Sequence, residues 1–213
     1  MSRLLLVRHG QASWGAEDYD QLSPLGMQQS TSLGTSWEAF DWAPTTAVAG
    51  GMKRHAQTAI ATIDASGQGD GYDIDAGWDE FDHHALARAH DPRSLTKDPK
   101  TFQASLNGAI HAWMAGSTIE GESYQTFVAR VMRAFDAAVA DAGSGRTVAV
   151  FTSGGPIAQV VSHLLAGDDS LFQRTNDVVV NASVTTVIVG SSGPRLLTFN
   201  EHTHLPRDMV TFR

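Results

Sequence analysis

The fold is decided at residues 4–11, which read Leu4-Leu5-Leu6-Val7-Arg8-His9-Gly10-Gln11. The apolar run ends abruptly in polar residues, as a buried strand does where it passes into a loop. Further on, Ser23-Pro24 is a helix-start signal, with Ser as the N-cap and Pro in the first helical position. We therefore expect a strand at Arg3–Val7, a helix at Pro24–Phe40 and a fold of the α/β class.

The rest of the chain continues this alternation. We expect strands at Thr46–Ala49, near Tyr72–Ile74 and at Thr147–Thr152, helices at Met52–Ala65, Phe102–Met114, Glu122–Ala142 and Ile157–Leu165, and a hairpin of Ser183–Val189 with Arg195–Phe199. The helix at 52–65 is expected to carry Ala56, Ala59, Ile60 and Ile63 on one face.

Alternating strands and helices predict a mainly parallel sheet with helices on both faces, and the hairpin adds a late antiparallel strand. The expected fold is therefore a three-layer α/β/α sandwich. No internal repeat and no Pro/Ser-rich linker divides the sequence, so a single domain over residues 1–213 is expected.

The composition excludes several classes of protein. The chain has 213 residues, 15 Lys plus Arg against 23 Asp plus Glu, hence a formal net charge of −8, and nine histidines. It has no cysteine, which rules out disulfides, thiol nucleophiles and cysteine–metal sites. The acidic balance argues against nucleic acid and anionic membranes as partners. The opening apolar run is too short for a signal peptide, and no stretch suits a membrane span, so a cytoplasmic location is expected.

Three polar segments follow predicted strands and indicate a phosphate pocket. They are Arg8-His9-Gly10-Gln11, the Gly50–Arg54 segment and Ser153-Gly154-Gly155. In open α/β sheets, ligands bind at the carboxyl ends of the strands, where these segments are expected to meet. Arginine binds phosphate oxygens through two parallel hydrogen bonds, and helix N-termini add backbone N–H donors. A neutral His9 between these cations is suited to attack phosphorus.

Six motifs in the same order carry a resemblance to a known family. They are the run at residues 4–11, Leu22-Ser23-Pro24-Leu25-Gly26 with Gln29, Arg54 with Gln57-Thr58-Ala59, Trp78-Asp79-Glu80, Gly121-Glu122-Ser123, and Asn200 with His204-Leu205. With them the chain resembles the histidine phosphatase superfamily, in its phosphoglycerate-mutase-like branch. The matches span residues 3 to 205.

The resemblance implies a role for each matching residue. His9 is the phosphorylated nucleophile, Arg8 and Arg54 hold the phosphoryl group, and Glu80 protonates the leaving oxygen and later activates water. The residues expected to contact phosphate or substrate are Gln11, Ser23, Ser153, Gly154 and His83. No metal and no cofactor is implied, and a metal site at His202 and His204 is not expected because other ligands are missing.

One departure from the family pattern bears on activity. The family usually has Ser-His-Gly-Gly after its late strand, whereas this chain has Thr152-Ser153-Gly154-Gly155, so Ser153 stands where a second catalytic histidine is expected. Loss of one transition-state donor typically slows an enzyme about a hundred- to a thousand-fold. Three interpretations stay open. Ser153 with the Gly154 and Gly155 N–H groups sustains a slower enzyme, or another histidine such as His83 or His84 supplies the charge, or the protein binds phosphate with little turnover.

Hydrolysis is favoured over mutase activity. A phosphosugar or phosphoglycerate mutase must hold a second anionic group, and relatives that do so carry extra basic residues in the insert after the acid segment. Residues 101–129 contain no Arg or Lys. The expected activity is thus phosphomonoester hydrolysis of a small phosphorylated substrate. The alternatives are a mutase and a phospho-ligand binding relative, and the sequence leaves the substrate and the oligomeric state open.

Overall fold

The computed structural model describes residues 2–13, 18–40, 44–67, 71–91, 99–117, 121–143 and 145–212, and all structural statements below refer to them. The strands in this part are β1 (Ser2–Arg8), β2 (Thr46–Ala49), β3 (Asp73–Ile74), β4 (Thr147–Thr152), β5 (Val184–Gly190) and β6 (Gly193–Glu201). The α-helices are α1 (Pro24–Phe40), α2 (Lys53–Ser66), α3 (His83–His90), α4 (Pro99–Met114), α5 (Tyr124–Asp141), α6 (Gly154–Ala166) and α7 (Phe172–Asn176). Two short 3₁₀ helices are η1 (Ala76–Trp78) and η2 (Arg207–Met209).

The described strands form one sheet in the order β3-β2-β4-β1-β5-β6. β1 pairs in parallel with β4, with Arg8 opposite Thr152, and β2 pairs in parallel with both β4 and β3. β5 is antiparallel to β1 and to β6, which confirms the prediction of a mainly parallel sheet with a late antiparallel strand. Because β1 and β4 are central, parallel neighbours, the residues that follow them lie side by side.

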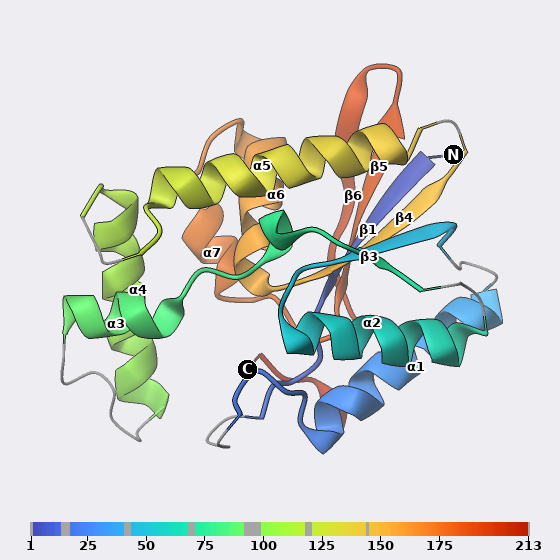
Figure 1. Ribbon diagram of the computed structural model, residues 1–213, viewed down its shortest axis with the longest axis horizontal. Helices are drawn as coiled ribbons and strands as arrows, with labels where there is room; N and C mark the ends of the chain where they lie inside the picture. Colours follow the sequence, from blue (N-terminus) through green and yellow to red (C-terminus); the bar gives the residue numbers. More distant parts are fainter. Residues whose placement is uncertain are drawn as a thin grey trace.

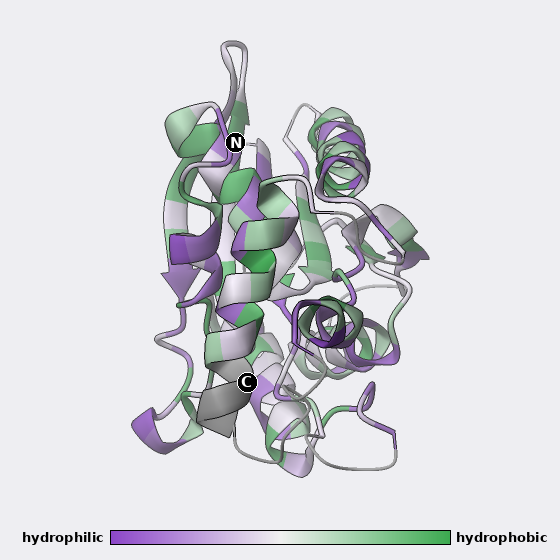
Figure 2. Ribbon diagram, turned by 90° about the vertical axis from the view of Figure 1, so that its left-hand side faces the viewer, coloured by the Kyte–Doolittle hydropathy of each residue, from purple (hydrophilic) through white to green (hydrophobic). Residues whose placement is uncertain are grey.

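Two hydrophobic cores, one on each face of the sheet, make the fold a three-layer sandwich (Figure 1). Leu4 and Leu6 of β1 face the core beneath α5 and α6. Leu5 and Val7 face the opposite core, which includes Leu33 of α1 and other residues of α1 and α2. This alternation is the two-residue period of a strand buried on both faces. The helices are banded green and purple in Figure 2, as expected of helices with one buried and one exposed side.

The ends of several elements agree with the sequence patterns, but the buried face of α2 agrees only in part. The bounds of α1, β2 and β4 are those expected from their start signals and apolar runs. In α2, however, Ile60 is 48% exposed, and the buried side chains include Arg54, His55 and Thr58. Of the four residues expected on one face, Ala59 and Ile63 are buried, whereas Ile60 is exposed. The polar side chains at the start of the helix are buried because they border the carboxyl ends of the strands, while Ala59 and Ile63 pack into the hydrophobic core further along.

The helix α7 was not expected from the sequence, and for α3 only a helix that includes His90 was expected, without bounds. Their neighbourhood is held by an aromatic cluster in which the rings of Phe81, Trp113 and Phe127 lie 5.0 to 5.6 Å apart, centroid to centroid. Phe172 of α7 joins this cluster. The cluster anchors the residue next to Glu80 and so fixes the position of that carboxyl group. No helix in the described ranges has the length and apolarity that crossing a membrane would require.

Close contact between α1 and α2 generates a stability prediction at Gly34. A Cβ at this position would overlap the carbonyl oxygen of Thr62 and crowd the side chain of Ala65. Replacing Gly34 by Ala should lower the free energy of unfolding by about 1–3 kcal/mol, the usual cost of overpacking, although Ala alone would favour the helix. Chemical denaturation measures this change. Thr35→Ala, on the exposed side of the same helix, is the control and should change the free energy by less than about 0.5 kcal/mol. Equal stability of Gly34→Ala and wild type would contradict the close approach.

Candidate active site

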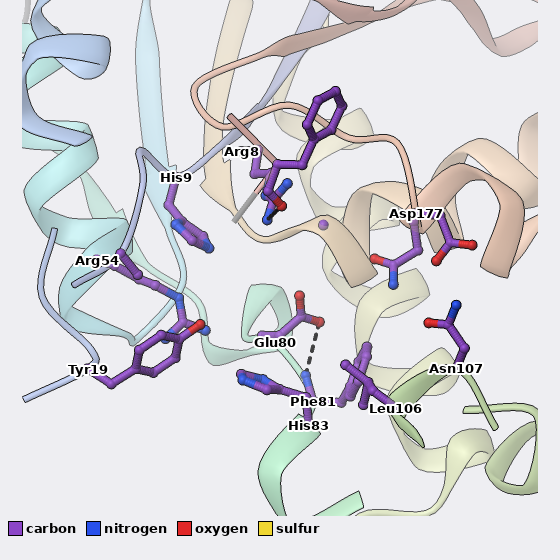
Figure 3. Close-up of a pocket in the computed structure, with 14 residues that line it drawn as sticks. Arg8, His9, Tyr19, Arg54, Glu80, Phe81, His83, Leu106, Asn107 and Asp177 are labelled. Atoms are coloured by element: carbon purple, nitrogen blue, oxygen red, sulfur yellow. Dashed lines mark hydrogen bonds between the residues drawn. The ribbon is translucent and has the colours of Figure 1, made fainter. Parts of the chain in front are cut away.

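A cavity of about 420 Å³ lies at the carboxyl ends of β1 and β4. Its described lining includes five groups with catalytic or phosphate-binding potential, Arg8, His9, Arg54, Glu80 and His83, together with Gly154 at the start of α6. The five side chains come from three separate segments and point toward a common space (Figure 3), and Gly154 adds a fourth segment. The structure thus brings together six of the nine residues expected at the site, from positions up to 146 apart in the chain.

His9 is held as a neutral imidazole with one nitrogen free. Its Nδ1 lies 2.7 Å from the carbonyl oxygen of Gly10, and because a carbonyl only accepts, Nδ1 carries the hydrogen. Nε2 therefore keeps its lone pair. Burial, with the charges of Arg54 and Arg8 as further causes, lowers the pKa of His9 well below its ordinary value. The ring is consequently unprotonated near neutral pH and suited to act as a nucleophile.

The guanidinium groups of Arg8 and Arg54 flank this ring. Arg8 donates through Nη1 to the carbonyl oxygen of Val179 and through Nη2 to that of Phe212, the latter at 3.0 Å. Its Nε is buried and has no hydrogen-bond partner among the described residues, and the same holds for Nε of Arg54. Burial lowers the pKa of Arg8 to about 10, which still leaves the group charged near neutrality. Arg54 is buried and Arg8 is half-buried, and the two cations with their buried, unused Nε donors form a site for an anion.

Arg54 is positioned by a loop that the sequence analysis did not single out. Its Nη1 donates to Asp20 Oδ1 at 2.7 Å, and its guanidinium carbon lies 5.9 Å from the ring centroid of Tyr19. Lys53 forms a second ion pair in this loop, with Asp18. The only signal in the sequence is the acidic pair at residues 18 and 20, which is ordinary for a surface loop.

Glu80 is placed in the cavity as a carboxyl group with a raised pKa. Burial is the main cause, opposed by hydrogen bonds from Gly155 and Phe81 and by the charges of Arg54 and Arg8. Oε2 accepts from the N–H of Gly155 at 3.0 Å, and Oε1 accepts from that of Phe81 at 3.2 Å (Figure 3). A Cβ at Gly155 would overlap Oε1, so a glycine is required for the carboxyl group to approach α6 this closely.

His83 lines the cavity without supplying charge. Burial, with the neighbouring His84 as the next cause, lowers the pKa of His83 to about 3, and burial also lowers that of His84. Both imidazoles are therefore neutral near pH 7. In the absence of a bound anion, neither imidazole supplies the charge of a second catalytic histidine, and that interpretation stays a prediction.

Gln11, Ser23 and Ser153 are absent from the described cavity lining. Ser23 donates from Oγ to Gln11 Oε1 at 2.8 Å, so these two residues tie the loop after β1 to the start of α1. Ser153 is fully buried, and its Oγ lies 2.7 Å from Nε2 of His55. These contacts place the three residues beside the cavity lining, and their contact with phosphate stays a prediction.

The end of the cavity away from the arginines was missed by the sequence analysis. It is lined by Leu106 and Asn107 of α4 and by Asn176 and Asp177 at the end of α7, whereas Phe212, whose carbonyl oxygen accepts from Arg8, lines the cavity beside that arginine. These positions come from weakly patterned segments, and no motif marks them. Their amides and carboxylate give this end a polar character without a described cation. Within the described ranges, no three His, Asp or Glu side chains gather as a metal site would need.

Comparison with known proteins agrees with this geometry. The chain matches the model of the histidine phosphatase superfamily (branch 1) over residues 4–202. Among curated proteins, none is similar enough to count as a match. Solved structures with the same fold include a phosphoserine phosphatase mutant from Entamoeba histolytica in complex with phosphoserine, with a TM-score of 0.68 and 19% identity, covering 97% of this chain and 100% of that one.

Two further structures show the range of relatives. A mycobacterial glucosyl-3-phosphoglycerate phosphatase has a TM-score of 0.67 and 23% identity, covering 94% of this chain and 99% of that one. A phosphoglycerate mutase from Bacillus anthracis has a TM-score of 0.68 and 18% identity, covering 95% and 94%. At these identities the likeness shows the fold, while the family model covers nearly the whole chain. The chain therefore belongs to the histidine phosphatase superfamily, branch 1, and is an enzyme of the phosphatase type.

Proposed function

We propose that the protein hydrolyses the phosphate monoester of a small molecule through a phosphohistidine on His9. The observation that carries the proposal is the free Nε2 of a neutral His9 between two guanidinium groups whose buried Nε atoms have no described partner. Phosphoryl transfer depends mainly on positioning and on neutralising the equatorial oxygens, which this arrangement provides. The relatives with solved structures include phosphatases named for small phosphorylated compounds, which is consistent with such a substrate.

The first chemical step forms the phosphoenzyme. Nε2 of His9 attacks phosphorus, the bond from phosphorus to the ester oxygen breaks, and protonated Glu80 gives its proton to the departing oxygen. The raised pKa of Glu80 favours the protonated form that this step needs. Arg8, Arg54 and the N–H of Gly154 are the proposed ligands of the phosphoryl oxygens.

The second step releases phosphate. Glu80, now a carboxylate, takes a proton from water as the water oxygen attacks phosphorus. The bond from phosphorus to Nε2 breaks, the electron pair returns to His9, and inorganic phosphate leaves. The two guanidinium groups neutralise the transferring group in both steps, so we propose that turnover needs no metal ion. The cytoplasmic location and the single domain over residues 1–213 stay predictions.

Hydrolysis fits the cavity better than mutase activity. A mutase must hold a second anionic group of its substrate while the first phosphoryl group is exchanged. Among the described lining residues, the cations are Arg8 and Arg54, at one end, whereas Asp177 and two amides occupy the other. A carboxylate there opposes a second anion and favours an alcohol that offers hydroxyl or amino donors.

The phosphoenzyme itself tests the proposed function. Mixing the protein with ³²P-labelled substrate or p-nitrophenyl phosphate and quenching in alkali should trap acid-labile phosphate on His9, with release of phosphate over many turnovers. His9→Ala should lower turnover by at least about 10⁴-fold, because the nucleophile and its phosphoenzyme are both lost. His163→Ala, on an exposed position of α6, is the control and should match wild type. Turnover that survives His9→Ala would contradict the mechanism, and phosphate binding without turnover in wild type would favour the binding relative.

The dependence of kcat/KM on pH should show the ionisation of both Glu80 and His9. Protonation of His9 should reduce kcat/KM only well below pH 6.5, because its pKa is lowered, whereas ionisation of Glu80 should reduce it as the pH rises through a pKa above 4.5. Glu80→Gln should remove the alkaline limb and slow hydrolysis of an alkyl phosphate by about 10²–10⁴-fold.

The choice of leaving group distinguishes the role of Glu80 as the acid of the first step from its role as the base of the second step. p-Nitrophenolate needs little protonation, so Glu80→Gln should keep a burst of p-nitrophenol while steady turnover falls. Rapid-quench and stopped-flow measurements distinguish these phases. Asp136→Asn, exposed on α5, is the matched control. An unchanged alkaline limb in Glu80→Gln would assign the proton donor to another group.

A further inference from the structure

A buried histidine that the steps above do not use lies directly beside the proposed nucleophile. His55 on α2 is fully buried, and its ring centroid lies 5.8 Å from that of His9. From its place next to Arg54 in the sequence, His55 would ordinarily be interpreted as a solvent-exposed helix residue. Its complete burial shows that it is not one.

Nε2 of His55 is engaged by Ser153. The two atoms Nε2 and Oγ are 2.7 Å apart in a fully buried contact between α2 and the start of α6. Ser153 is the N-cap residue of α6, yet its side chain makes no capping hydrogen bond. Serine at an N-cap usually satisfies a backbone N–H of the first turn. Here the hydroxyl is directed to the imidazole instead, at the border of the cavity that Gly154 lines.

Nδ1 of His55 faces a carboxylate. Asp79 Oδ1 lies 3.8 Å away, and Nδ1 has no hydrogen-bond partner among the described residues. Asp79 is itself fixed by the N–H of Gly51, which donates to Oδ1 at 2.5 Å. The glycine at position 50 leaves the space that the His55 ring occupies, since a Cβ there would overlap Nδ1. The imidazole thus sits between a hydroxyl on one nitrogen and a carboxylate on the other.

We propose that His55 and Ser153 form a positioning pair that takes up a proton when an anion occupies the phosphoryl site. The proposal rests on the proposed function. With one proton, His55 can accept the hydroxyl hydrogen of Ser153 at Nε2. With a second proton, taken from solvent, Nε2–H donates to Oγ and Nδ1–H faces Asp79. The Ser153 hydroxyl hydrogen is then free to point toward the phosphoryl group.

The charges around His55 explain why an anion is needed to drive the change. Burial and Arg54 lower the pKa of His55, and His9 and Asp79 are the other titratable groups that face it, from the end of β1 and from the segment after η1. Without a ligand, the cationic surroundings keep the ring neutral. A dianion held by Arg8 and Arg54 offsets these charges, and the carboxylate of Asp79 stabilises the imidazolium. The pair then supplies both the charge and the donor that Ser153 alone would lack.

Ligand-linked proton uptake tests the pair directly. Sulfate is a suitable probe because it mimics the phosphoryl group and does not titrate near neutrality. Calorimetry near pH 6.5, in buffers of different ionisation enthalpy, should show wild type taking up protons as sulfate binds. His55→Gln keeps a hydrogen-bond donor of similar size but cannot be charged, so it should take up fewer protons. His163→Gln, exposed on α6, is the control. Equal uptake by wild type and His55→Gln would overturn the proposal.

Kinetics of substitutions at both positions provide a second, independent test. His55→Gln and Ser153→Ala should each slow phosphatase turnover by about 10- to 100-fold, and the double variant should be little slower than either one, since the residues act as a unit. Additive losses would overturn the pairing. Wild-type phosphohistidine on His9 is measured first, because its absence would count against the proposed function and not against this pair.

A swap of the two residues distinguishes chemistry from packing. Ser153→His alone should lower turnover, because Oγ already touches the His55 ring and a second imidazole has no room. His55→Ala empties that space, so the double variant His55→Ala with Ser153→His should be at least tenfold faster than His55→Ala alone. Higher turnover from Ser153→His in the presence of His55 would overturn the proposal, as would a double variant no faster than His55→Ala.

Discussion

The placement of two guanidinium groups with buried Nε atoms at the carboxyl ends of β1 and β2 is the constraint on which the rest of the site depends. Taking a cation out of water costs several kcal/mol unless its donors are satisfied. The fold meets part of this cost, with backbone carbonyls around Arg8 and the Asp20 carboxylate on Arg54. The Nε of each stays without a described partner. A bound anion would accept hydrogen bonds from these Nε donors. Affinity for a phosphoryl group therefore follows from the donors that the folded protein leaves without a partner.

The same two cations set the protonation of their neighbours. They reinforce burial in lowering the pKa of His9, but they oppose burial at Glu80, where desolvation wins and the pKa is raised. A nucleophile without a proton and an acid with one can therefore coexist in one cavity near neutral pH. This local field is independent of the formal net charge of −8, which describes the whole chain. An acidic protein can hold an anion because the nearest charges dominate inside a buried cavity.

Sequence patterns predicted the parts of the molecule that local physics specifies. Buried strands and capped helices such as β4 and α1 follow from apolar runs and start signals, and the parallel order brings Arg8, His9 and Gly154 to one edge. The short helix α7 was missed because packing of Phe172 into an aromatic cluster, rather than periodicity, holds it in place. Asp177 was missed for the same reason. Ser153 was placed in the phosphate site by its position in a motif, but a side chain's direction depends on what packs against it.

The pair of His55 and Ser153 shows why a departure from a family pattern cannot be judged from one position. The sequence has a serine where a histidine is expected, and by itself this suggests loss of charge. In space, an imidazole occupies the adjoining volume, but it comes from α2 and enters through a slot that Gly50 keeps open. The chemistry of the site thus depends on three positions in different segments, namely Ser153, His55 and Gly50. A substitution at one of them changes the space available to the others, so only their combination determines whether the site is complete.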